Sequence, residues 1–168
     1  MKNNTIMKMA QIMAEESKCV SHKVGAIIVK DNRIISTGIN GTPIGQMNCC
    51  DHFNEDIRPD LFGRPQLICA GVLERRLNEQ GKNEHREWSL KNEIHAELNA
   101  ILFAAKHGIA IDGATMYTTL SPCSNCAKAI SQSGIKRLIY DALYHKAEPS
   151  WDKILKQAKI EVLHIDEV

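Results

Sequence analysis

Helix-like and strand-like patterns alternate through the second half of this chain, and that alternation restricts the possible folds more than any other feature. Apolar spacing predicts helices over about residues 93–107, 123–132 and 151–158. Strand patterns lie between and after them, at 114–120, 136–143 and 160–165. Strands joined through helices can lie parallel in one sheet, with right-handed crossovers. The pattern therefore predicts an α/β fold in which helices cover a sheet.

The first forty residues predict a helix followed by a β-hairpin. Asn4 or Thr5 can cap this helix, which runs to about Lys18 and has four apolar residues on one face, Ile6, Met9, Ala10 and Met13. Strand patterns at 24–29 and 33–38 flank the turn Asp31-Asn32. From about residue 40 to 92 a long loop or insertion is expected, with only a weak helix pattern at 68–80 ahead of Gly81.

The length of 168 residues suits one compact domain, so we expect a single domain spanning residues 1–168. Hydrophobic residues make up 43% and charged residues 24%, which is typical of a folded protein rather than a disordered chain. The net charge of +1 argues against a basic face that grips a long nucleic acid. A small anionic ligand needs only one or two local cations and is compatible with this charge.

The N-terminal residues and the cysteine content indicate a compartment. Met1-Lys2-Asn3-Asn4-Thr5 lacks the apolar segment of a secretory signal, and no apolar run reaches the roughly 20 residues of a membrane span. We therefore expect a cytoplasmic protein with no membrane partner. Its six cysteines would then be metal ligands or buried thiols in preference to disulfides.

Two short motifs carry the chemistry, and each lies where a helix is predicted to begin. They are His95-Ala96-Glu97 and Pro122-Cys123-Ser124-Asn125-Cys126. Two thiolates spaced three apart and one neutral imidazole supply three zinc ligands and leave the fourth tetrahedral position open for water. Helix N-termini favour the thiolate form of the cysteines. A carboxylate near the metal but not bound to it, as expected of Glu97, can move protons.

Each motif has an ordinary explanation when taken alone. A C-x-x-C pair is often a redox couple or half of a structural zinc site. A single histidine near the start of an amphipathic helix is more often a surface or core residue than a ligand. Together the motifs match the H-x-E…P-C-x-x-C signature of the zinc nucleobase deaminases, in which the glutamate is not a ligand.

With these residues, the chain resembles the cytidine deaminase superfamily and, within it, the deoxycytidylate (dCMP) deaminases of T-even-type bacteriophages. The resemblance is carried by Glu87-Trp88-Ser89, by residues 91–105, by Gly113-Ala114-Thr115-Met116-Tyr117 and by Ser121-Pro122-Cys123. It extends from the first helix to the last strand and is weakest at about residues 51–83.

The resemblance implies a fold, a reaction and a catalytic centre. The fold is the three-layer α/β/α cytidine deaminase-like fold, with a five-stranded mixed sheet whose last two strands are parallel. The reaction is hydrolysis of dCMP to dUMP and ammonia, which supplies thymidylate synthesis. Zinc would be held by His95, Cys123 and Cys126, and Glu97 would be the proton shuttle.

The resemblance also implies a set of substrate contacts. Asn40 corresponds to the residue that contacts the sugar, and Ser21 and Lys23 lie where the family meets the 5′-phosphate. Ala96 and Tyr144 are expected beside the nucleotide. The alternative explanation for these positions is a polar surface or a turn.

Allosteric control is a further expectation from the resemblance. The segment Gly38-Ile39-Asn40-Gly41 corresponds to an effector site at which dCTP with Mg²⁺ activates and dTTP inhibits. Ile39 replaces the tyrosine usual there, which removes a stacking surface, so altered effector affinity is expected. The resemblance also implies a homo-oligomer, usually a hexamer, in the host cell cytoplasm.

A second, structural zinc is implied by the same resemblance, with Cys19, Cys49, His85 and Glu93 as ligands. Such an ion would order a loop that has little apolar material. The alternative is two buried thiols, a solvated histidine and a helix N-terminal glutamate. Cys50 and His52 are spare candidate ligands, and no role is predicted for Cys69.

Two rival functions remain open from the sequence. A related deaminase acting on a base in tRNA or single-stranded DNA needs a basic groove and stacking aromatics, whereas aromatic residues are only 5% here. A non-catalytic zinc-binding domain would explain the metal ligands but gives Glu97 no purpose.

Overall fold

A computed structural model of the chain describes residues 1–54, 79–144 and 150–168. In chain order the elements are α1 (Asn3–Ala14), β1 (Gly25–Lys30), β2 (Arg33–Ile39), α2 (Cys49–Asn54), α3 (Glu79–Asn92), α4 (Ala96–Lys106), β3 (Thr115–Leu120), α5 (Ser124–Gln132), β4 (Arg137–Ala142), α6 (Trp151–Gln157), β5 (Glu161–His164) and the 3₁₀ turn η1 (Ile165–Glu167). Over these described ranges, no helix combines the length and the apolar character that crossing a membrane requires.

The contacts of the chain divide it into two compact units. Unit 1 comprises Met1–Ser17, Val24–Asn40 and His95–Val168, and unit 2 comprises Lys18–Lys23 and Gly41–Ile94. The single domain expected over residues 1–168 stays a prediction. Most of the interval expected to be a loop or insertion, about residues 40–92, falls in unit 2.

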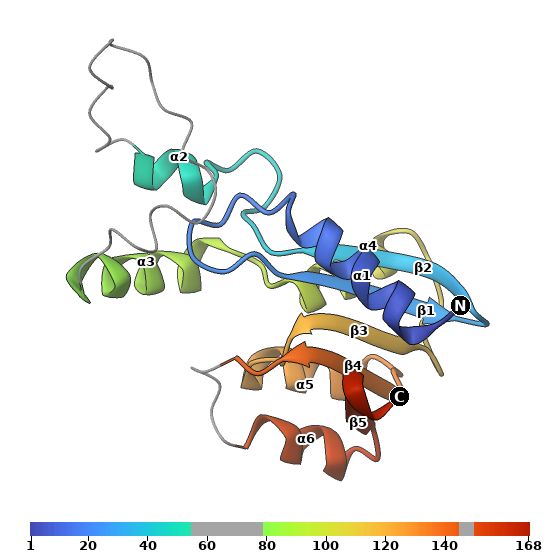
Figure 1. Cartoon of the computed structure of the whole chain (residues 1–168). Coiled ribbons are helices and arrows are strands. Elements are labelled where there is room, and N and C mark those ends of the chain that lie inside the picture. The colour runs from blue at the N-terminus through green and yellow to red at the C-terminus, as the bar shows by residue number, and fades with distance from the viewer. Residues whose placement is uncertain (55–78, 145–149) are drawn as a thin grey trace. The chain divides into compact units, whose positions relative to one another are not determined.

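Unit 1 is built on a five-stranded sheet with the order β2-β1-β3-β4-β5 (Figure 1). The strand β1 pairs antiparallel with both β2 and β3, whereas β3 with β4 and β4 with β5 are parallel pairs. The prediction of a mixed sheet whose last two strands are parallel is confirmed. The helices α5 and α6 make the two crossovers between the parallel strands, as the alternating pattern predicted.

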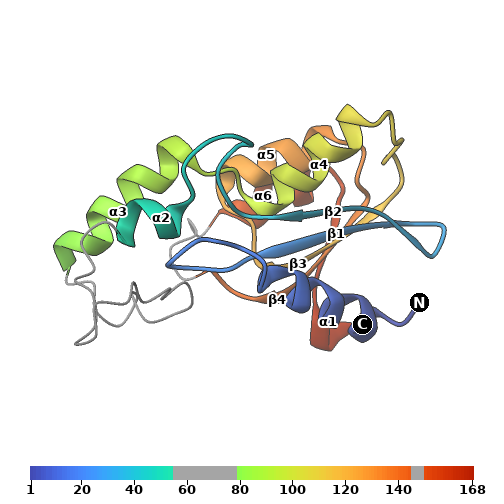
Figure 2. The ribbon, with the colours of Figure 1, turned by 90° about the horizontal axis from the view of Figure 1, so that it is seen from above.

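Helices cover both faces of this sheet, which gives three layers (Figure 2). Successive strand residues point to opposite faces. On one face, Ile28 and Leu138 pack with residues of α4, α5 and α6, whereas Ile27 and Ile139 pack on the other face with α1. All four strand residues are fully buried. The near-continuous apolar runs of the strands are therefore explained by burial on both sides.

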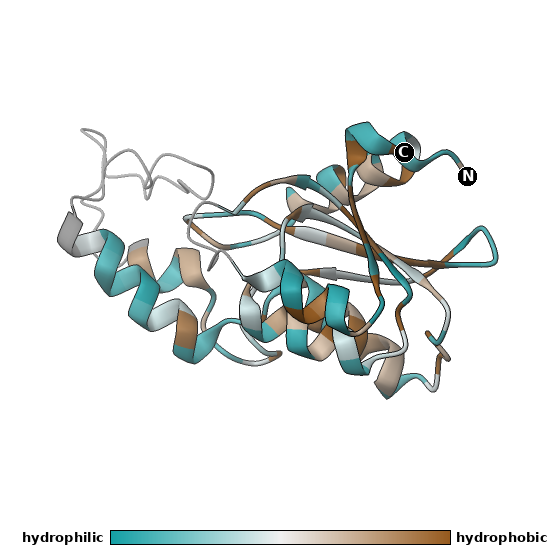
Figure 3. Ribbon diagram, turned by 90° about the horizontal axis from the view of Figure 1, so that it is seen from below, coloured by the Kyte–Doolittle hydropathy of each residue, from teal (hydrophilic) through white to brown (hydrophobic). Residues whose placement is uncertain are grey.

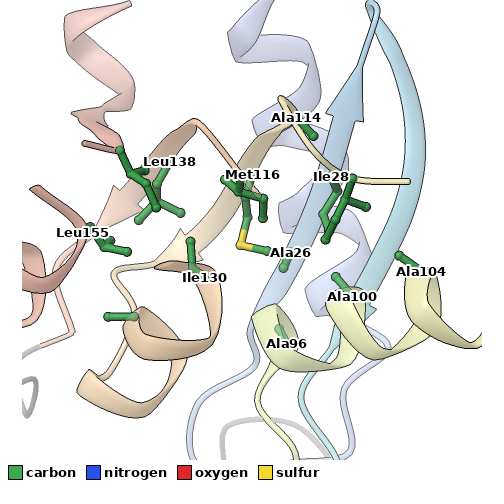
Figure 4. Packing of buried hydrophobic residues seen from close by; sticks show 14 of the residues in the cluster. Ala26, Ile28, Ala96, Ala100, Ala104, Ala114, Met116, Ile130, Leu138 and Leu155 are labelled. Carbon is green, nitrogen blue, oxygen red and sulfur yellow. The ribbon is translucent and has the colours of Figure 1, made fainter. Parts of the chain in front are cut away.

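The helix α4 lies close to the sheet, because three alanines face it. Ala96, Ala100 and Ala104 are buried, and Figure 4 shows them turned toward β1. A Cβ atom on Gly38 of β2 would lie 2.2 Å from the Ala96 carbonyl oxygen and 2.5 Å from the Ala100 nitrogen. The glycine is thus required by the close approach of strand and helix, and this contact positions the start of α4.

The first helix differs from its prediction in start, face and length. Lys2 is its N-cap, and neither Asn4 nor Thr5 caps it, since both already lie within the helix. Met9, expected on the apolar face, is 40% exposed, whereas Met7 is 2% exposed. The buried face of the helix carries residues spaced three or four apart, such as Met7, Ala10 and Ala14. Met7 therefore faces the sheet and Met9 does not. The helix ends at Ala14 and not at Lys18, and Lys18 already belongs to unit 2.

The described part of unit 2 contains two helices, α2 and α3, where a loop or insertion was expected. The expected helix at 68–80 lies outside the described residues apart from its last two, but Gly81 does not end a helix, since it lies inside α3. This helix is largely hydrophilic, as Figure 3 shows for the helix beside the grey trace. An antiparallel bridge joins Gly41 to Ile94. After α3 ends at Asn92, α4 begins only at Ala96, later than predicted.

Candidate metal centres and active site

The first candidate metal centre lies in unit 1, where two helices begin. His95 is the N-cap of α4 and Cys123 is the N-cap of α5, both with extended backbone. The His95 Nδ1 atom lies 3.4 Å from the Cys123 sulfur and 3.5 Å from the Cys126 sulfur. The three donor atoms all lie within 4.8 Å of one another. One nitrogen and two sulfurs at these separations fit a tetrahedral zinc ion that keeps one position open.

The electrostatics of this centre favour a cation. The Cys126 thiol and the His95 ring hold the pKa of Cys123 far below its usual value, at about 3. The pKa of Cys126 is raised by the same pairing and by burial, because a second thiolate beside the first would be repelled. The pair therefore shares one proton, and a divalent cation binding there would take the place of that proton.

Glu97 lies beside this centre, in the first turn of α4 and two residues after His95. It is only 4% exposed. Its carboxyl group is not part of the set of mutually close donor atoms. Burial raises the pKa of this carboxyl group, opposed by the nearby His95 ring. A buried carboxylate next to a metal centre, with a raised pKa, is suited to accept and release protons.

The second candidate centre lies entirely in unit 2. The donor atoms of Cys19, Cys49, His85 and Glu93 all lie within 4.8 Å of one another. The His85 Nε2 atom is 3.3 Å from the Cys49 sulfur and 3.6 Å from the Cys19 sulfur. The Cys19 sulfur is 3.5 Å from Glu93 Oε2. Two thiols, an imidazole and a carboxylate make a complete four-ligand set for zinc.

The electrostatics of this second centre also favour a cation. The bond from Cys49 holds the pKa of Cys19 low, at about 4, and the same pairing raises the pKa of Cys49. Burial raises the pKa of the Glu93 carboxyl group. Glu93 Oε1 is buried and has no hydrogen-bond partner within the part of the chain that the structure describes. A buried acceptor without a partner is costly, and a bound cation would satisfy it.

The spare candidate ligands are not part of the second centre. The Cys50 sulfur lies 3.6 Å from Asp51 Oδ1, and the His52 ring stacks on Trp88 with centroids 4.8 Å apart. Neither belongs to a cluster of donor atoms in the described residues. Cys69 lies outside the described residues.

The family model described as "Cytidine and deoxycytidylate deaminase zinc-binding region" matches residues 1–142. The chain belongs to this family. It is 51% identical to the deoxycytidylate deaminase of Enterobacteria phage T4, over 98% of this chain and 90% of that protein.

More distant relatives agree with this assignment. ComE operon protein 2 of Bacillus subtilis is 32% identical over 98% of this chain and 71% of that protein. The solved dCMP deaminase of cyanophage S-TIM5, in complex with dCMP and dUMP, is 30% identical. It superposes with a TM-score of 0.68 over 96% of this chain and 94% of that chain. The deaminase fold predicted from the sequence is therefore confirmed.

Asn40, expected to contact the sugar in this deaminase family, is held in place from several sides. It is 7% exposed. Its Oδ1 atom accepts a hydrogen bond of 2.8 Å from the Val24 backbone N–H, and its own N–H donates to the Val24 carbonyl. Its carbonyl accepts a bond of 2.8 Å from the Ser17 hydroxyl. The side-chain amide is therefore oriented with its nitrogen, which can only donate, away from Val24.

The other expected substrate residues are distributed over both units. The Tyr144 backbone N–H donates to the Ser121 hydroxyl at 2.9 Å, so Tyr144 is tied to the segment that leads into Cys123. Ala96 is fully buried. Ser21 and Lys23 belong to unit 2. The roles of all four in substrate binding stay predictions.

The expected effector segment crosses from one unit to the other. Gly38, Ile39 and Asn40 end the second portion of unit 1, and Gly41 begins the longer portion of unit 2. Ile39 is half-buried, and its carbonyl accepts a bond of 2.8 Å from the Asn99 side chain. Gly38 has a packing reason to be glycine, whereas a Cβ atom on Gly41 would meet nothing within 4 Å.

Two residues with contacts in these sites were missed by the sequence analysis. The Ser89 hydroxyl donates to Glu93 Oε2 at 2.7 Å, and Asn99 holds Ile39. His85, Ser89 and Glu93 recur every four residues, which is the spacing of one helix face and could have connected them. Asn99 has no such signal, because its partner is 60 residues away.

Proposed function

We propose that this chain hydrolyses dCMP to dUMP and ammonia, and that the cluster of His95, Cys123 and Cys126 is its catalytic zinc centre. The observation that carries the proposal is the His95 nitrogen within 3.4 and 3.5 Å of two sulfurs, beside a buried carboxylate. The family and the phage relatives named as deoxycytidylate deaminases support the choice of substrate.

Glu97 would carry out the proton transfers. His95, Cys123 and Cys126 would hold the zinc ion, which would lower the pKa of a bound water from about 15.7 to roughly 7. The Glu97 carboxylate takes a proton from the attacking water and delivers it to N3 of the pyrimidine. It then moves a second proton from the new hydroxyl at C4 to the amino group. The C4–N bond breaks, ammonia leaves, and the C4 carbonyl of dUMP remains.

The substrate would be held by Asn40, Ser21, Lys23, Ala96 and Tyr144. The Asn40 amide nitrogen suits a sugar hydroxyl, because that end of the side chain can only donate and the hydroxyl can accept. A lysine and a serine suit the 5′-phosphate, since one cation and one hydroxyl satisfy a small anion.

The second centre is proposed to bind a structural zinc through Cys19, Cys49, His85 and Glu93. The support is a complete four-ligand set, a lowered pKa at Cys19 and the unpartnered buried oxygen of Glu93. A closed set of four protein ligands leaves no position for water, so this ion would have no part in the reaction.

Regulation, assembly and cellular role are proposed from the family resemblance. We propose that dCTP with Mg²⁺ activates and dTTP inhibits through Gly38, Ile39, Asn40 and Gly41, that the protein assembles as a hexamer, and that it supplies dUMP for thymidylate synthesis in the host cell cytoplasm. Because Ile39 has no aromatic ring, effector binding is expected to be weaker than in relatives with tyrosine there.

The proposal is tested by following cytosine absorbance with dCMP, deoxycytidine, cytidine and a cytosine-containing oligonucleotide, with and without dCTP and Mg²⁺. Rapid turnover of dCMP alone supports the assignment, and a rise with dCTP supports the regulation. Turnover of the oligonucleotide with no turnover of dCMP would contradict the assignment and favour a nucleic-acid deaminase. Zinc binding with no turnover of any substrate would favour a non-catalytic zinc domain.

A further inference from the structure

One side chain links the helix that carries the reaction centre to the strand end that precedes Asn40. The Nδ2 atom of Asn99 donates to the carbonyl of Ile39 at 2.8 Å, across a separation of 60 residues. Asn99 is partly buried on α4, two residues after Glu97. Ile39 is the last residue of β2, so the bond acts on the peptide unit that leads directly into Asn40.

Other contacts already attach the helix α4 to β2. The hydrogen bond of Asn99 is therefore not needed merely to hold strand and helix together. The Ser36 hydroxyl donates to the Ala100 carbonyl at 2.6 Å, and Gly38 packs against the Ala96 carbonyl. These contacts hold strand and helix together, but they act before the strand reaches Asn40. The Asn99 bond is the contact that extends the attachment to the end of the strand.

The start of α4 carries a proposed metal ligand, the proposed proton shuttle and Asn99, each two residues after the one before. His95 is its N-cap, Glu97 lies in its first turn and Asn99 follows two residues later. A helix is rigid over such a distance, so the bond from Asn99 ties the Ile39 carbonyl, and with it the start of Asn40, to the helix that carries Glu97. Val24 and Ser17 hold Asn40 from the other sides, but neither residue lies on that helix. A small misplacement of a substrate-holding group is enough to reduce productive binding.

We infer that Asn99 is a positioning residue, which fixes Asn40 so that the sugar of the nucleotide is held in register with Glu97. The inference rests on the proposed function, in which Asn40 contacts the sugar. Asn99 itself touches neither substrate nor metal in this role.

A double-mutant cycle on dCMP kinetics tests the inference. Asn99→Ala is expected to raise KM for dCMP about tenfold, the size of effect of one hydrogen bond, with kcat changed less than about twofold and the zinc content unchanged. In an Asn40→Ala background the same substitution is expected to have no further effect, because the residue through which it acts is gone. Additive effects on KM, or an unchanged KM in Asn99→Ala, would overturn the inference.

Ser36→Ala is the matched control, since it removes a hydrogen bond between the same strand and helix without touching the Asn40 segment. It is expected to lower the melting temperature and leave KM unchanged. If Ser36→Ala raised KM as much as Asn99→Ala does, the effect of Asn99 would be explained by the general attachment of strand to helix, and the inference would be wrong.

Amide hydrogen exchange separates this inference from the proposed function. Asn99→Ala is expected to accelerate exchange in the peptide that contains the Asn40 N–H, and Ser36→Ala is not. If the unsubstituted protein fails to turn over dCMP, the proposed function fails, and this exchange comparison still decides whether Asn99 fixes Asn40. Equal exchange in the two variants would contradict the inference.

Discussion

The two candidate metal centres use the same residue types and differ in where the glutamate lies. Each has two cysteines, one histidine and one glutamate within or beside it. In unit 2 the Glu93 carboxylate is one of four mutually close donors, whereas in unit 1 Glu97 stands outside a set of three. Three protein ligands leave a position for water and four do not. The position of one carboxylate thus separates a centre suited to proton transfer from a centre suited to holding structure.

The two centres also differ in the apolar packing of the units that contain them. Unit 1 has two apolar clusters on the faces of its sheet that hold together without the metal ligands. Among the described residues of unit 2, the buried apolar cluster consists of Cys19, Val20, Cys49 and Cys50, with Phe53 and Trp88 packed against it. Two of the four buried members are themselves proposed ligands. Metal binding is therefore expected to contribute more to the folding of unit 2 than of unit 1.

Exchanging each glutamate for glutamine gives the largest expected contrast between the centres. Glu97→Gln is expected to lower the deamination rate by roughly 10²–10⁴-fold, because an amide cannot accept the proton. Two zinc ions per chain are expected to remain. Glu93→Gln is expected to lose the second zinc and to reduce the rate far less. Absorbance assays with zinc analysis by atomic absorption measure both. A normal rate in Glu97→Gln would remove the distinction between the two carboxylates.

Removing one cysteine of the closed centre tests whether it holds a metal at all. Cys49→Ala is expected to leave one zinc per chain and to lower the melting temperature, since a three-ligand remnant in a small apolar cluster binds weakly. Cys50→Ala is the control, because Cys50 is equally buried and adjacent but contributes no donor atom to the centre. It is expected to retain two zinc ions. A Cys49→Ala protein with two zinc ions would contradict the four-ligand assignment.

Much of unit 1 could be predicted from the sequence, because its signals are local. The alternation of helices and strands and the start of α5 are each encoded within a few residues, whereas the start of α4 was predicted too early. His95 and Cys123 act at helix N-termini, which short motifs reveal. The relation between strands β3, β4 and β5 follows from the helices that join them.

Unit 2 was harder to predict, because its helix α3 has no apolar stripe. Its buried side is provided by His85 and Trp88 around the second centre and not by a run of aliphatic residues. Gly81 also predicts the end of a helix from the sequence alone, although it lies inside α3. Hydrogen bonds such as that of Asn99 to Ile39 depend on the tertiary fold, so no local pattern reports them.

Adding one methyl group at Gly38 tests whether the close packing of β2 against the start of α4, which carries the first centre, contributes to stability. Gly38→Ala would place a Cβ atom 2.2 Å from the Ala96 carbonyl, so strand and helix must separate. The expected loss in unfolding free energy is about 1–3 kcal/mol. Gly41→Ala is the control, since nothing lies within 4 Å of its Cβ position. Chemical denaturation measures both, and equal stability of the two variants would show that the close approach is not required.

The smallest effect is expected from Ser89, which supports the closed centre without being a ligand. Its hydroxyl donates to Glu93 Oε2 at 2.7 Å and so orients the carboxylate. Ser89→Ala is expected to weaken zinc binding at this centre by about tenfold, the lower end for residues that hold a metal ligand. Ser89→Thr keeps the hydroxyl and is expected to restore the affinity. Competition with a chelator measures the second zinc separately from the rate of deamination, which is expected to stay unchanged. An equal loss of affinity in the threonine variant would indicate a packing role for Ser89. An effect confined to alanine would mean that the closed centre depends on a donor outside its four ligands.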